Sequence, residues 1–335
     1  MASRKDVAEL AGVSPASVSY YINQNGYVSK EAGEKIQFAV DKLNYTPNAI
    51  ARSLRIKDSK QFVFFCNDIR NPFYSQLVHR ATKVATEKDY TVLFSPVVDN
   101  EEHIKKMVSF QVSGVFASNN HMNVNQINNI AKRDIPVVLL RDIDWPDLDE
   151  SVSQIKVLFA SIMEEIVEHL KEEGAKNICY IASCSSLNIG KIDSKTTAFI
   201  KASKDIKHSV LHNISATADG YNSFLEAFKE DPSIDSVVCT NDGVALGVLK
   251  AAEKLNLSVP EDIKIIGFDN SSISQYSNPP ITSVDINSDE IGKIAVDMLL
   301  SKTKKETVED VIIKPKLIIR RSSKKIKHFY MEITK

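Results

Sequence analysis

The sequence has few of the features that mark secreted, membrane-spanning or metal-binding proteins. It has four cysteines in 335 residues, and their spacing fits neither a zinc site nor a redox pair. No apolar run approaches the roughly 18 residues of a membrane span, and the N-terminus has no hydrophobic signal region. We therefore expect a cytoplasmic protein with free, buried thiols, which are those of Cys66, Cys179, Cys184 and Cys239.

Enzyme motifs are also missing. The chain has no GxGxxG, no Walker loop and no GxSxG sequence, and residues 188–191 lack the remaining glycine of a phosphate-binding loop. The seven histidines are scattered along the chain and do not suggest a metal site. We therefore expect no enzymatic activity, no cofactor and no metal.

A large excess of one charge is missing as well, but the charges are unevenly distributed. The formal net charge is −1, which by itself argues against a nucleic-acid-binding protein. Residues 1–60, however, contain nine Lys/Arg and six Asp/Glu, whereas the remainder contains 33 and 37. A basic N-terminal segment on an acidic body fits DNA contact at one end of the chain.

The N-terminal residues predict two short helices joined by a tight turn. Apolar residues at helical intervals favour a helix over residues 6–11, and Gly12 would end it in a left-handed conformation. Ser14 is a candidate N-cap for a second helix that reaches residue 23, and Pro15 follows at its first position. This pattern is typical of a helix-turn-helix, whose second helix lies in the DNA major groove. An ordinary helical hairpin would show the same pattern.

Residues 6–23 resemble the DNA-binding headpiece of the LacI/GalR family of bacterial transcription regulators. The residues that carry the resemblance are Asp6, Val7, Ala8, Ala11, Gly12, Val13, Ser14, Ser17, Val18, Ser19, Ile22 and Asn23. Further blocks at 28–36 and 43–54 match in content and in spacing. By the order of elements the resemblance covers nearly the whole chain, and it is strongest in residues 5–55 and 241–269.

The resemblance implies a helix-turn-helix domain over residues 1–47 and a hinge helix with its linker over 48–60. In the family the hinge helix orders when two copies pair over the DNA minor groove. Its leucine, here Leu54, then wedges into the central base step; the alternative is that Leu54 packs on the next domain. The residues that we expect at the DNA are Ser14, Pro15, Ala16, Ser17, Ser19, Tyr20, Asn23, Asn48, Ala51, Arg52 and Leu54.

Four positions depart from the family pattern in this region. Arg4 stands where the family usually has an apolar residue, and Ala32-Gly33 replaces a Thr-Arg pair inside an expected third helix, residues 29–43. A glycine there should weaken the helix by roughly 0.5–1 kcal/mol. Tyr20 sits where members often carry an Arg or His that faces bases.

From residue 61 apolar runs alternate with amphipathic segments, as in an α/β fold whose parallel sheets are covered on both faces. The expected strands are 62–65, 91–94, 114–117, 136–140, 178–181, 237–239, 263–267, 281–286, 311–313 and 317–319. The expected helices are 74–88, 102–112, 124–133, 160–173, 194–204, 219–229 and 291–300, with another beginning at Asn241.

Two such lobes resemble the periplasmic-binding-protein-like core of the family, here residues 61–325. We expect one lobe from about 61–157 and 288–322 and the other from about 158–287, followed by a tail, 326–335, without assigned function. The segment 281–286 should cross back from the second lobe. Lobes of this kind bind ligands in the cleft at the carboxyl ends of their strands.

The expected effector cleft combines family residues with departures. By resemblance, Asn241 and Asp269 bond effector hydroxyls, although Asn241 or Asp242 can equally be a plain helix N-cap. The candidate cleft residues are Phe73, Tyr74, Arg141, Lys195, Asn241 and Asp269.

Two aromatic and two cationic residues of this set allow more than one interpretation. Phe73 ends the family block at 71–73 and Tyr74 follows it; these residues could cover a sugar or base ring, or Phe73 could pack in the core. Arg141 falls where members often have Asp, and Lys195 falls near the usual effector-binding Arg. These two cations indicate an anionic effector in place of a neutral sugar, or a decayed pocket with solvated cations.

Together these features predict a homodimeric, sequence-specific repressor that binds a pseudo-palindromic DNA operator and responds to a sugar-like or anionic small molecule. Two alternatives remain open: a solute-binding sensor without DNA activity, and a regulator controlled by a protein partner.

Overall fold

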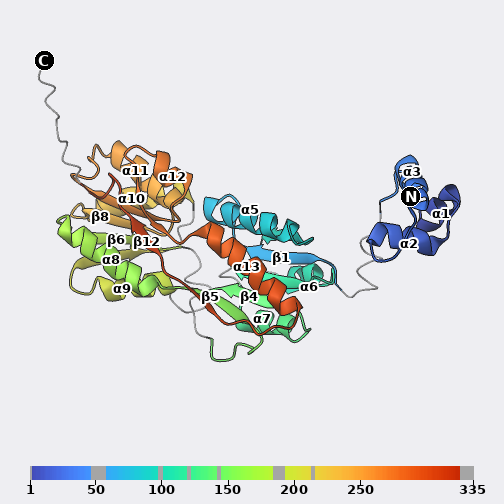
Figure 1. The fold of residues 1–335 in the computed structure, drawn as a ribbon. Helices are drawn as coiled ribbons and strands as arrows, with labels where there is room; N and C mark the ends of the chain where they lie inside the picture. Colours follow the sequence, from blue (N-terminus) through green and yellow to red (C-terminus); the bar gives the residue numbers. More distant parts are fainter. Residues whose placement is uncertain are drawn as a thin grey trace, which may run out of the picture. The chain divides into compact units, whose positions relative to one another are not determined.

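A computed structural model describes residues 2–46, 58–96, 101–118, 122–141, 145–183, 193–212 and 216–324. The chain divides into two compact units, Met1–Ser59 and Lys60–Lys335 (Figure 1). The hinge helix that we expect, with Asn48, Ala51, Arg52 and Leu54, lies outside the described residues, as does Cys184.

The described residues of the first unit form three helices, α1 (Arg4–Ala11), α2 (Pro15–Asn23) and α3 (Lys30–Lys42). Gly12 ends α1 with φ 66°, in the left-handed region that the sequence predicts. The helices enclose a small core of residues spaced at helical intervals, which are Val7, Ala8, Ala11, Val18, Ile36, Ala39 and Tyr45. The predicted helix-turn-helix and third helix are therefore present.

Gly33 has a packing role in α3. It is buried, and a Cβ atom at this position would lie 3.1 Å from Cε2 of Tyr21. The Tyr21 hydroxyl donates a hydrogen bond to Gln37 Oε1 at 3.1 Å. The glycine that lowers the intrinsic helix propensity of α3 thus makes room for the Tyr21 ring between α2 and α3.

The second unit has two six-stranded sheets, one in each lobe. The first has the order β11-β5-β4-β3-β1-β2, with β11 (Val311–Ile313), β5 (Ser153–Val157), β4 (Val137–Leu140), β3 (Gly114–Ser118), β1 (Gln61–Cys66) and β2 (Thr91–Pro96). The second has the order β12-β10-β9-β8-β6-β7, with β12 (Lys316–Ile318), β10 (Thr282–Asp285), β9 (Lys264–Phe268), β8 (Ser236–Cys239), β6 (Asn177–Ile181) and β7 (Lys207–Leu211).

Helices cover both faces of each sheet (Figure 1). They are α5 (Pro72–Thr86), α6 (Glu101–Val108), α7 (Val124–Ala131), α8 (Phe159–Glu172), α9 (Ser194–Ala202), α10 (Thr217–Glu230), α11 (Asp242–Lys254), α12 (Ser272–Tyr276) and α13 (Ser288–Thr303). In β1, Phe62 and Phe64 join the core under α5 and α13, whereas Val63 and Phe65 join the core under α6 and α7. A strand buried on both faces reads as a continuous apolar run, which is why the sequence predicts it.

Two glycines allow helices α10 and α11 to cross closely in the second lobe. A Cβ atom at Gly247 would lie 2.1 Å from the Thr217 carbonyl oxygen, and one at Gly220 would lie 2.6 Å from that of Val244. Each helix therefore places a glycine against the backbone of the other, and this contact fixes α11 above the second sheet.

One part of the expected lobe boundary is wrong. Helix α13 and strand β11 belong to the first lobe as expected, but β12 pairs antiparallel with β10 in the second sheet. Ser322 then fixes the chain to the second lobe, since its hydroxyl accepts a hydrogen bond from Thr282 N at 2.8 Å. Residues 281–286, by contrast, supply β10 of the second sheet, in agreement with the expected second-lobe range of about 158–287. A three-residue apolar strand does not reveal which sheet it joins.

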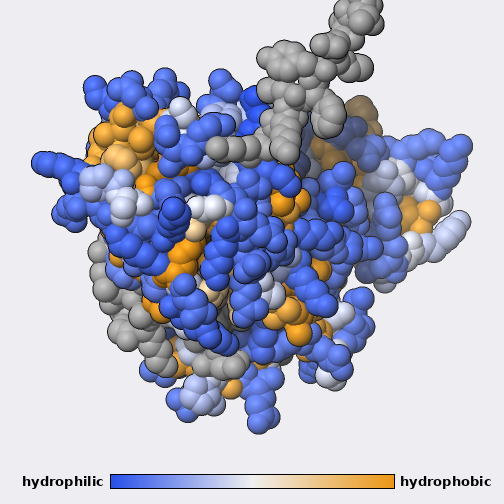
Figure 2. Space-filling model, turned by 90° about the vertical axis from the view of Figure 1, so that its left-hand side faces the viewer, coloured by the Kyte–Doolittle hydropathy of each residue, from blue (hydrophilic) through white to orange (hydrophobic). Residues whose placement is uncertain are grey.

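The face of the second unit shown in Figure 2 is mostly hydrophilic. The face shown in Figure 2 presents mainly hydrophilic side chains, and hydrophobic ones form small separate patches. Within the described ranges, no helix is long and apolar enough to cross a membrane. Cys66, Cys179 and Cys239 are free and buried, as expected.

Candidate DNA interface and effector cleft

The start of α2 is held by its own side chains. The Ser14 hydroxyl accepts a hydrogen bond from Ser17 N at 3.1 Å, and the two hydroxyl oxygens lie 2.9 Å apart. Pro15 occupies the first helical position, as predicted, and Pro15 and Ala16 are exposed. The expected base-reading residues at the beginning of the helix thus form a rigid surface with few hydrogen-bonding groups.

Ser19 and Asn23 are bonded to each other. Asn23 Nδ2 donates to the Ser19 carbonyl oxygen at 2.8 Å and to its hydroxyl at 3.1 Å. Both side chains are half-buried. This pair stabilises the C-terminal turn of α2, which is a structural role in addition to the DNA contact that we predict for these residues.

Tyr20 is 47% exposed on α2. A Cβ atom at Gly26 would lie only 2.7 Å from Cγ and Cδ1 of the Tyr20 ring. Gly26 has no positive φ, so its backbone conformation does not require a glycine. The contact with Tyr20 gives a physical reason for glycine at this position, and it fixes the direction of the Tyr20 side chain.

Of the residues that we expect in the cleft, Arg141, Asn241 and Asp269 follow the carboxyl ends of β4, β8 and β9, whereas Phe73 and Tyr74 lie in α5 and Lys195 lies in α9. Asp269 directly follows β9 and is 8% exposed, with φ 94°. Burial raises the pKa of Asp269 to about 7, whereas the charge of Lys195 opposes this shift. The side chain of Asn71, the N-cap of α5 in the first lobe, also lies close enough to lower the pKa of Asp269. Asp269 and Asn71 thus bring the two lobes into contact through polar side chains.

Lys195 lies beside this carboxyl group. Its ammonium nitrogen donates to the Thr240 carbonyl oxygen at 3.2 Å and lies 4.3 Å and 5.2 Å from the ring centroids of Phe268 and Phe159. Burial lowers the pKa of Lys195, and the negative charge of Asp269 is the strongest influence in the opposite direction. Two aromatic faces and one carbonyl group therefore hold a cation that would otherwise be costly to bury.

Asn241 and Asp242 have different structural roles. Asn241 is the N-cap of α11, with its Oδ1 accepting from Val244 N at 2.8 Å. Asp242 is 2% exposed and accepts hydrogen bonds from Ser271 N at 2.7 Å and from the Ser283 hydroxyl at 2.6 Å. The capping alternative thus applies to Asn241, and Asp242 links α11 to the loop after β9.

The two aromatic candidates of the first lobe differ. Phe73 is 5% exposed and belongs to the hydrophobic core, which favours the packing interpretation. Tyr74 is half-buried, and its hydroxyl accepts from Asn67 Nδ2 at 3.1 Å. Burial raises the pKa of Tyr74, and the nearby Cys66 and Asp269 add to this shift. Tyr74, rather than Phe73, is thus the aromatic residue near the polar cluster.

Arg141 follows β4, and its guanidinium contacts two groups of its own lobe. Its Nη1 donates to the Met122 carbonyl oxygen at 3.0 Å, and the guanidinium lies 4.0 Å from the Trp145 ring centroid. Burial lowers the pKa of Arg141 to about 10, so it remains a cation at neutral pH. The solvated-cation alternative does not describe it.

Sequence reasoning missed several residues of this cluster. Asn71 belongs to the block from which only Phe73 and Tyr74 are predicted as cleft residues. Its position after β1, where it caps α5, is a local signal that points to the same end of the sheet. Phe268 directly precedes Asp269, but an apolar residue at a strand end gives no sign that its ring faces a cation. Phe159 and Thr240 carry no sequence signal, because only the fold places them beside Lys195.

Two family models match the chain. Residues 4–48 match the model described as bacterial regulatory proteins, lacI family. Residues 167–323 match a periplasmic binding protein-like domain. The first match includes α1, α2 and α3 of the first unit. The second match lies in the second unit and includes all strands of the second sheet.

Curated relatives match over nearly their whole length. The HTH-type transcriptional repressor PurR of Histophilus somni (strain 2336) is 29% identical, covering 97% of this chain and 99% of the relative. The protein of the same name from Pasteurella multocida (strain Pm70) is 28% identical over the same shares.

Solved structures share the fold. The lac repressor dimer bound to operator and the anti-inducer ONPF has a TM-score of 0.81 at 22% identity, covering 96% of this chain and 99% of that one. A LacI-family regulator from Silicibacter pomeroyi has a TM-score of 0.82 at 20% identity, covering 97% and 100%. With the capped helix-turn-helix, the two-lobed core and the full-length relatives, these findings show that the chain belongs to the LacI/GalR family and is a DNA-binding transcriptional regulator, not an enzyme.

Proposed function

We propose that the protein is a homodimeric repressor that binds a pseudo-palindromic operator, and that a small molecule in the cleft between its lobes controls this binding. The observation that carries the proposal is the cluster of Asn71, Asp269 and Lys195, in which polar groups from both lobes meet at the carboxyl ends of the strands. A ligand bound there would contact both lobes and favour one arrangement of them. We place the protein in the cytoplasm, because a repressor works at the bacterial chromosome.

The DNA-binding part of the proposal rests on α2. Its exposed residues Pro15, Ala16 and Tyr20 offer apolar contacts and one hydroxyl, and none of them can form a bidentate pair with a base. We therefore infer that much of the sequence preference comes from DNA shape and from the hinge. The residues Asn48, Ala51, Arg52 and Leu54 remain our candidates for hinge contacts.

Selection of bound DNA from a random library tests this part directly. The expected product is an inverted repeat, because a twofold dimer presents two identical headpieces. Binding to the selected site should also weaken steeply as salt rises, because phosphate contacts release counterions. Failure to enrich any sequence, together with no measurable binding to DNA at low salt, would instead identify a ligand-binding sensor without DNA activity.

The effector should match the groups that face the cleft. Asp269 can accept a hydrogen bond from a hydroxyl or amine, and Lys195 can bind an anionic or carbonyl group. We propose a polar ligand that carries both kinds of group, such as a sugar acid or a phosphorylated sugar. Thermal-shift measurements with neutral sugars, nucleobases and phosphorylated sugars would identify the class, because a ligand that prefers the native state raises its melting temperature.

A substitution separates effector response from DNA binding. Lys195→Ala should abolish the response of operator affinity to the ligand found by thermal shift, while operator affinity without the ligand stays unchanged. Lys201→Ala is the matched control, since Lys201 is an exposed lysine on the same helix, α9. A neutral sugar that binds tightly and equally well to the Lys195→Ala variant would show that no anionic group is required.

A further inference from the structure

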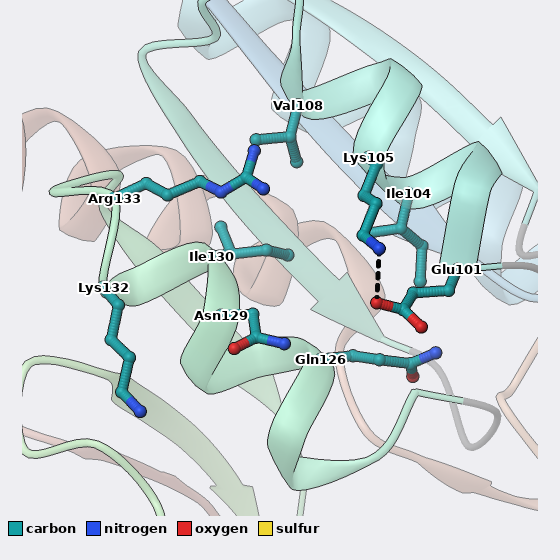
Figure 3. Close-up of a pocket in the computed structure, with 9 residues that line it drawn as sticks. All are labelled: Glu101, Ile104, Lys105, Val108, Gln126, Asn129, Ile130, Lys132 and Arg133. Atoms are coloured by element: carbon teal, nitrogen blue, oxygen red, sulfur yellow. Dashed lines mark ion pairs between the residues drawn. The ribbon is translucent and has the colours of Figure 1, made fainter.

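A second cavity lies away from the cleft, between helices α6 and α7 of the first lobe. Its volume is about 380 Å³, which lies within the range of small-molecule pockets. Figure 3 shows the nine residues that line it, which are Glu101, Ile104, Lys105, Val108, Gln126, Asn129, Ile130, Lys132 and Arg133. These two helices cover the face of the first sheet opposite to α5 and α13.

The inner surface of the cavity is apolar. Ile104, Val108 and Ile130 belong to the buried core under the two helices and present their remaining surface to the cavity. A ligand with an apolar body would cover this surface and gain the free energy of removing it from water.

The charged groups at the rim differ in their availability. Lys105 is paired with Glu101 at 2.8 Å, so these two charges offset each other. Lys132 points away from the cavity in Figure 3 and interacts electrostatically with Asp149. Arg133 extends from the end of α7 toward Val108 (Figure 3), and its guanidinium makes no hydrogen bond or ion pair with the described part of the chain.

Two amide side chains complete the lining. Gln126 is occupied, because its Oε1 accepts from Asn123 N at 2.9 Å in a capping box. Asn129 projects from α7 and lines the cavity (Figure 3), and among the described residues its side chain has no hydrogen-bond partner. The same cavity is thus lined by an apolar surface, by the guanidinium of Arg133 and by the amide of Asn129, and the last two can form hydrogen bonds with a ligand.

We propose that this cavity is a second ligand site, separate from the cleft, for a small amphipathic anion. The apolar body of the ligand would lie on Ile104, Val108 and Ile130, and its carboxylate, sulfonate or phosphate group would bind Arg133. Arginine is suited to this contact because its planar fork donates two parallel hydrogen bonds to such anions. Three cationic side chains and one carboxylate line the cavity, so its rim carries a net positive charge.

Fluorescence titration of the full chain with anilinonaphthalene sulfonate, an amphipathic anion, tests the site. We expect saturable binding at one site per chain in the Lys195→Ala variant, which lacks the anion contact that we propose for the cleft. Arg133→Gln should weaken it about tenfold, as expected for the loss of a charge-assisted hydrogen bond. Lys132→Gln is the matched control: it removes the same charge from the neighbouring residue, and it should leave binding unchanged. The neutral probe N-phenylnaphthylamine should bind the wild type and Arg133→Gln alike.

A second variant tests the location without changing charge. Asn129→Trp fills the space between the helices at an exposed position and should abolish binding of the sulfonate probe, whereas Lys195→Ala in the cleft should not. Equal losses for Arg133→Gln and Lys132→Gln would overturn the proposal, since the effect would then be general electrostatics. Unchanged binding to Asn129→Trp would overturn it as well, because the probe would lie elsewhere.

Discussion

Tyr20 and Gly26 act as a pair at the scale of single residues. The Tyr20 ring occupies the space where a side chain at position 26 would begin, with a separation of 2.7 Å to the position of a Cβ atom. Because the ring lies against the loop after α2, its hydroxyl reaches a defined region outside the helix. Gly26 is therefore a positioning residue for the base contact that we predict for Tyr20.

Gly26→Ala should change operator preference without unfolding the headpiece. The added methyl group forces the Tyr20 ring to move, so selection of bound DNA should show relaxed preference at the base pairs that Tyr20→Ala also affects. Because the residues touch, the effects of the two substitutions should not add. Asn25→Ala, in the same exposed loop, is the control. If Gly26→Ala selects the same sites with wild-type affinity, Tyr20 does not read bases.

Asp269 gives the second prediction at this scale. Its pKa is raised from 3.8 to about 7 in the folded protein, so the native state holds a proton that the unfolded state has lost between these values. The free energy of unfolding should therefore fall as pH rises from about 4 to 7, by at most about 1.4 kcal/mol per pH unit from this group. Below pH 4 both states are protonated and the contribution is constant.

Asp269→Asn should remove this contribution. Denaturant unfolding at several pH values between 4 and 8 would show a less negative slope of stability against pH in the variant. The comparison uses slopes, so a constant cost from leaving Lys195 without its neighbouring carboxylate does not affect it. Identical slopes for the two proteins would mean that Asp269 is ionised throughout this range.

At the scale of elements, the close crossing of α10 and α11 sets the position of Asn241 and Asp242. Gly247→Ala would place a methyl group 2.1 Å from the Thr217 carbonyl oxygen, and neither backbone can move without shifting a helix. We expect a loss of about 3 kcal/mol in the free energy of unfolding, at the upper end of the range for overpacking. Lys254→Ala, an exposed position on the same helix, should change stability by less than about 0.5 kcal/mol; an equally small effect of Gly247→Ala would contradict the crossing.

The elements also show what the sequence could and could not predict. Strands buried on both faces and capped helices were predictable, because apolar runs and residues such as Ser14, Pro15 and Gly12 are local signals. Strand β5 was not predicted, since Ser153–Val157 alternates polar and apolar residues at the edge of an irregular segment. The sheet that β12 joins was unpredictable because pairing is a long-range property.

The same distinction between local signals and long-range contacts applies to the candidate site. Asp269 and Asn241 could be placed at strand ends from motif and order alone. The contacts of Lys195 with Phe159 and Phe268, and the hydrogen bond of Arg141 to Met122, depend on segments that are distant in sequence. The anionic-effector hypothesis therefore now rests on Lys195 more than on Arg141.

For the whole molecule, the proposed function requires that ligand binding in the cleft and operator binding by the headpieces are coupled. If a ligand in the cleft changes the affinity for operator DNA, thermodynamic linkage requires DNA to change the affinity for the ligand by the same factor. A ligand without this property could occupy the cleft and still regulate nothing. The coupling factor is thus the quantity that distinguishes a regulator from a protein that binds DNA and a solute independently.

The most direct test measures this factor from both sides. Fluorescence anisotropy with the selected operator gives the DNA affinity with and without the effector found by thermal shift, and calorimetry gives the effector affinity with and without operator. We predict equal factors, of about 5 to 150 as in typical allosteric proteins, and a factor of one for Lys195→Ala. A factor of one in the wild-type protein would contradict the claim that the cleft controls DNA binding.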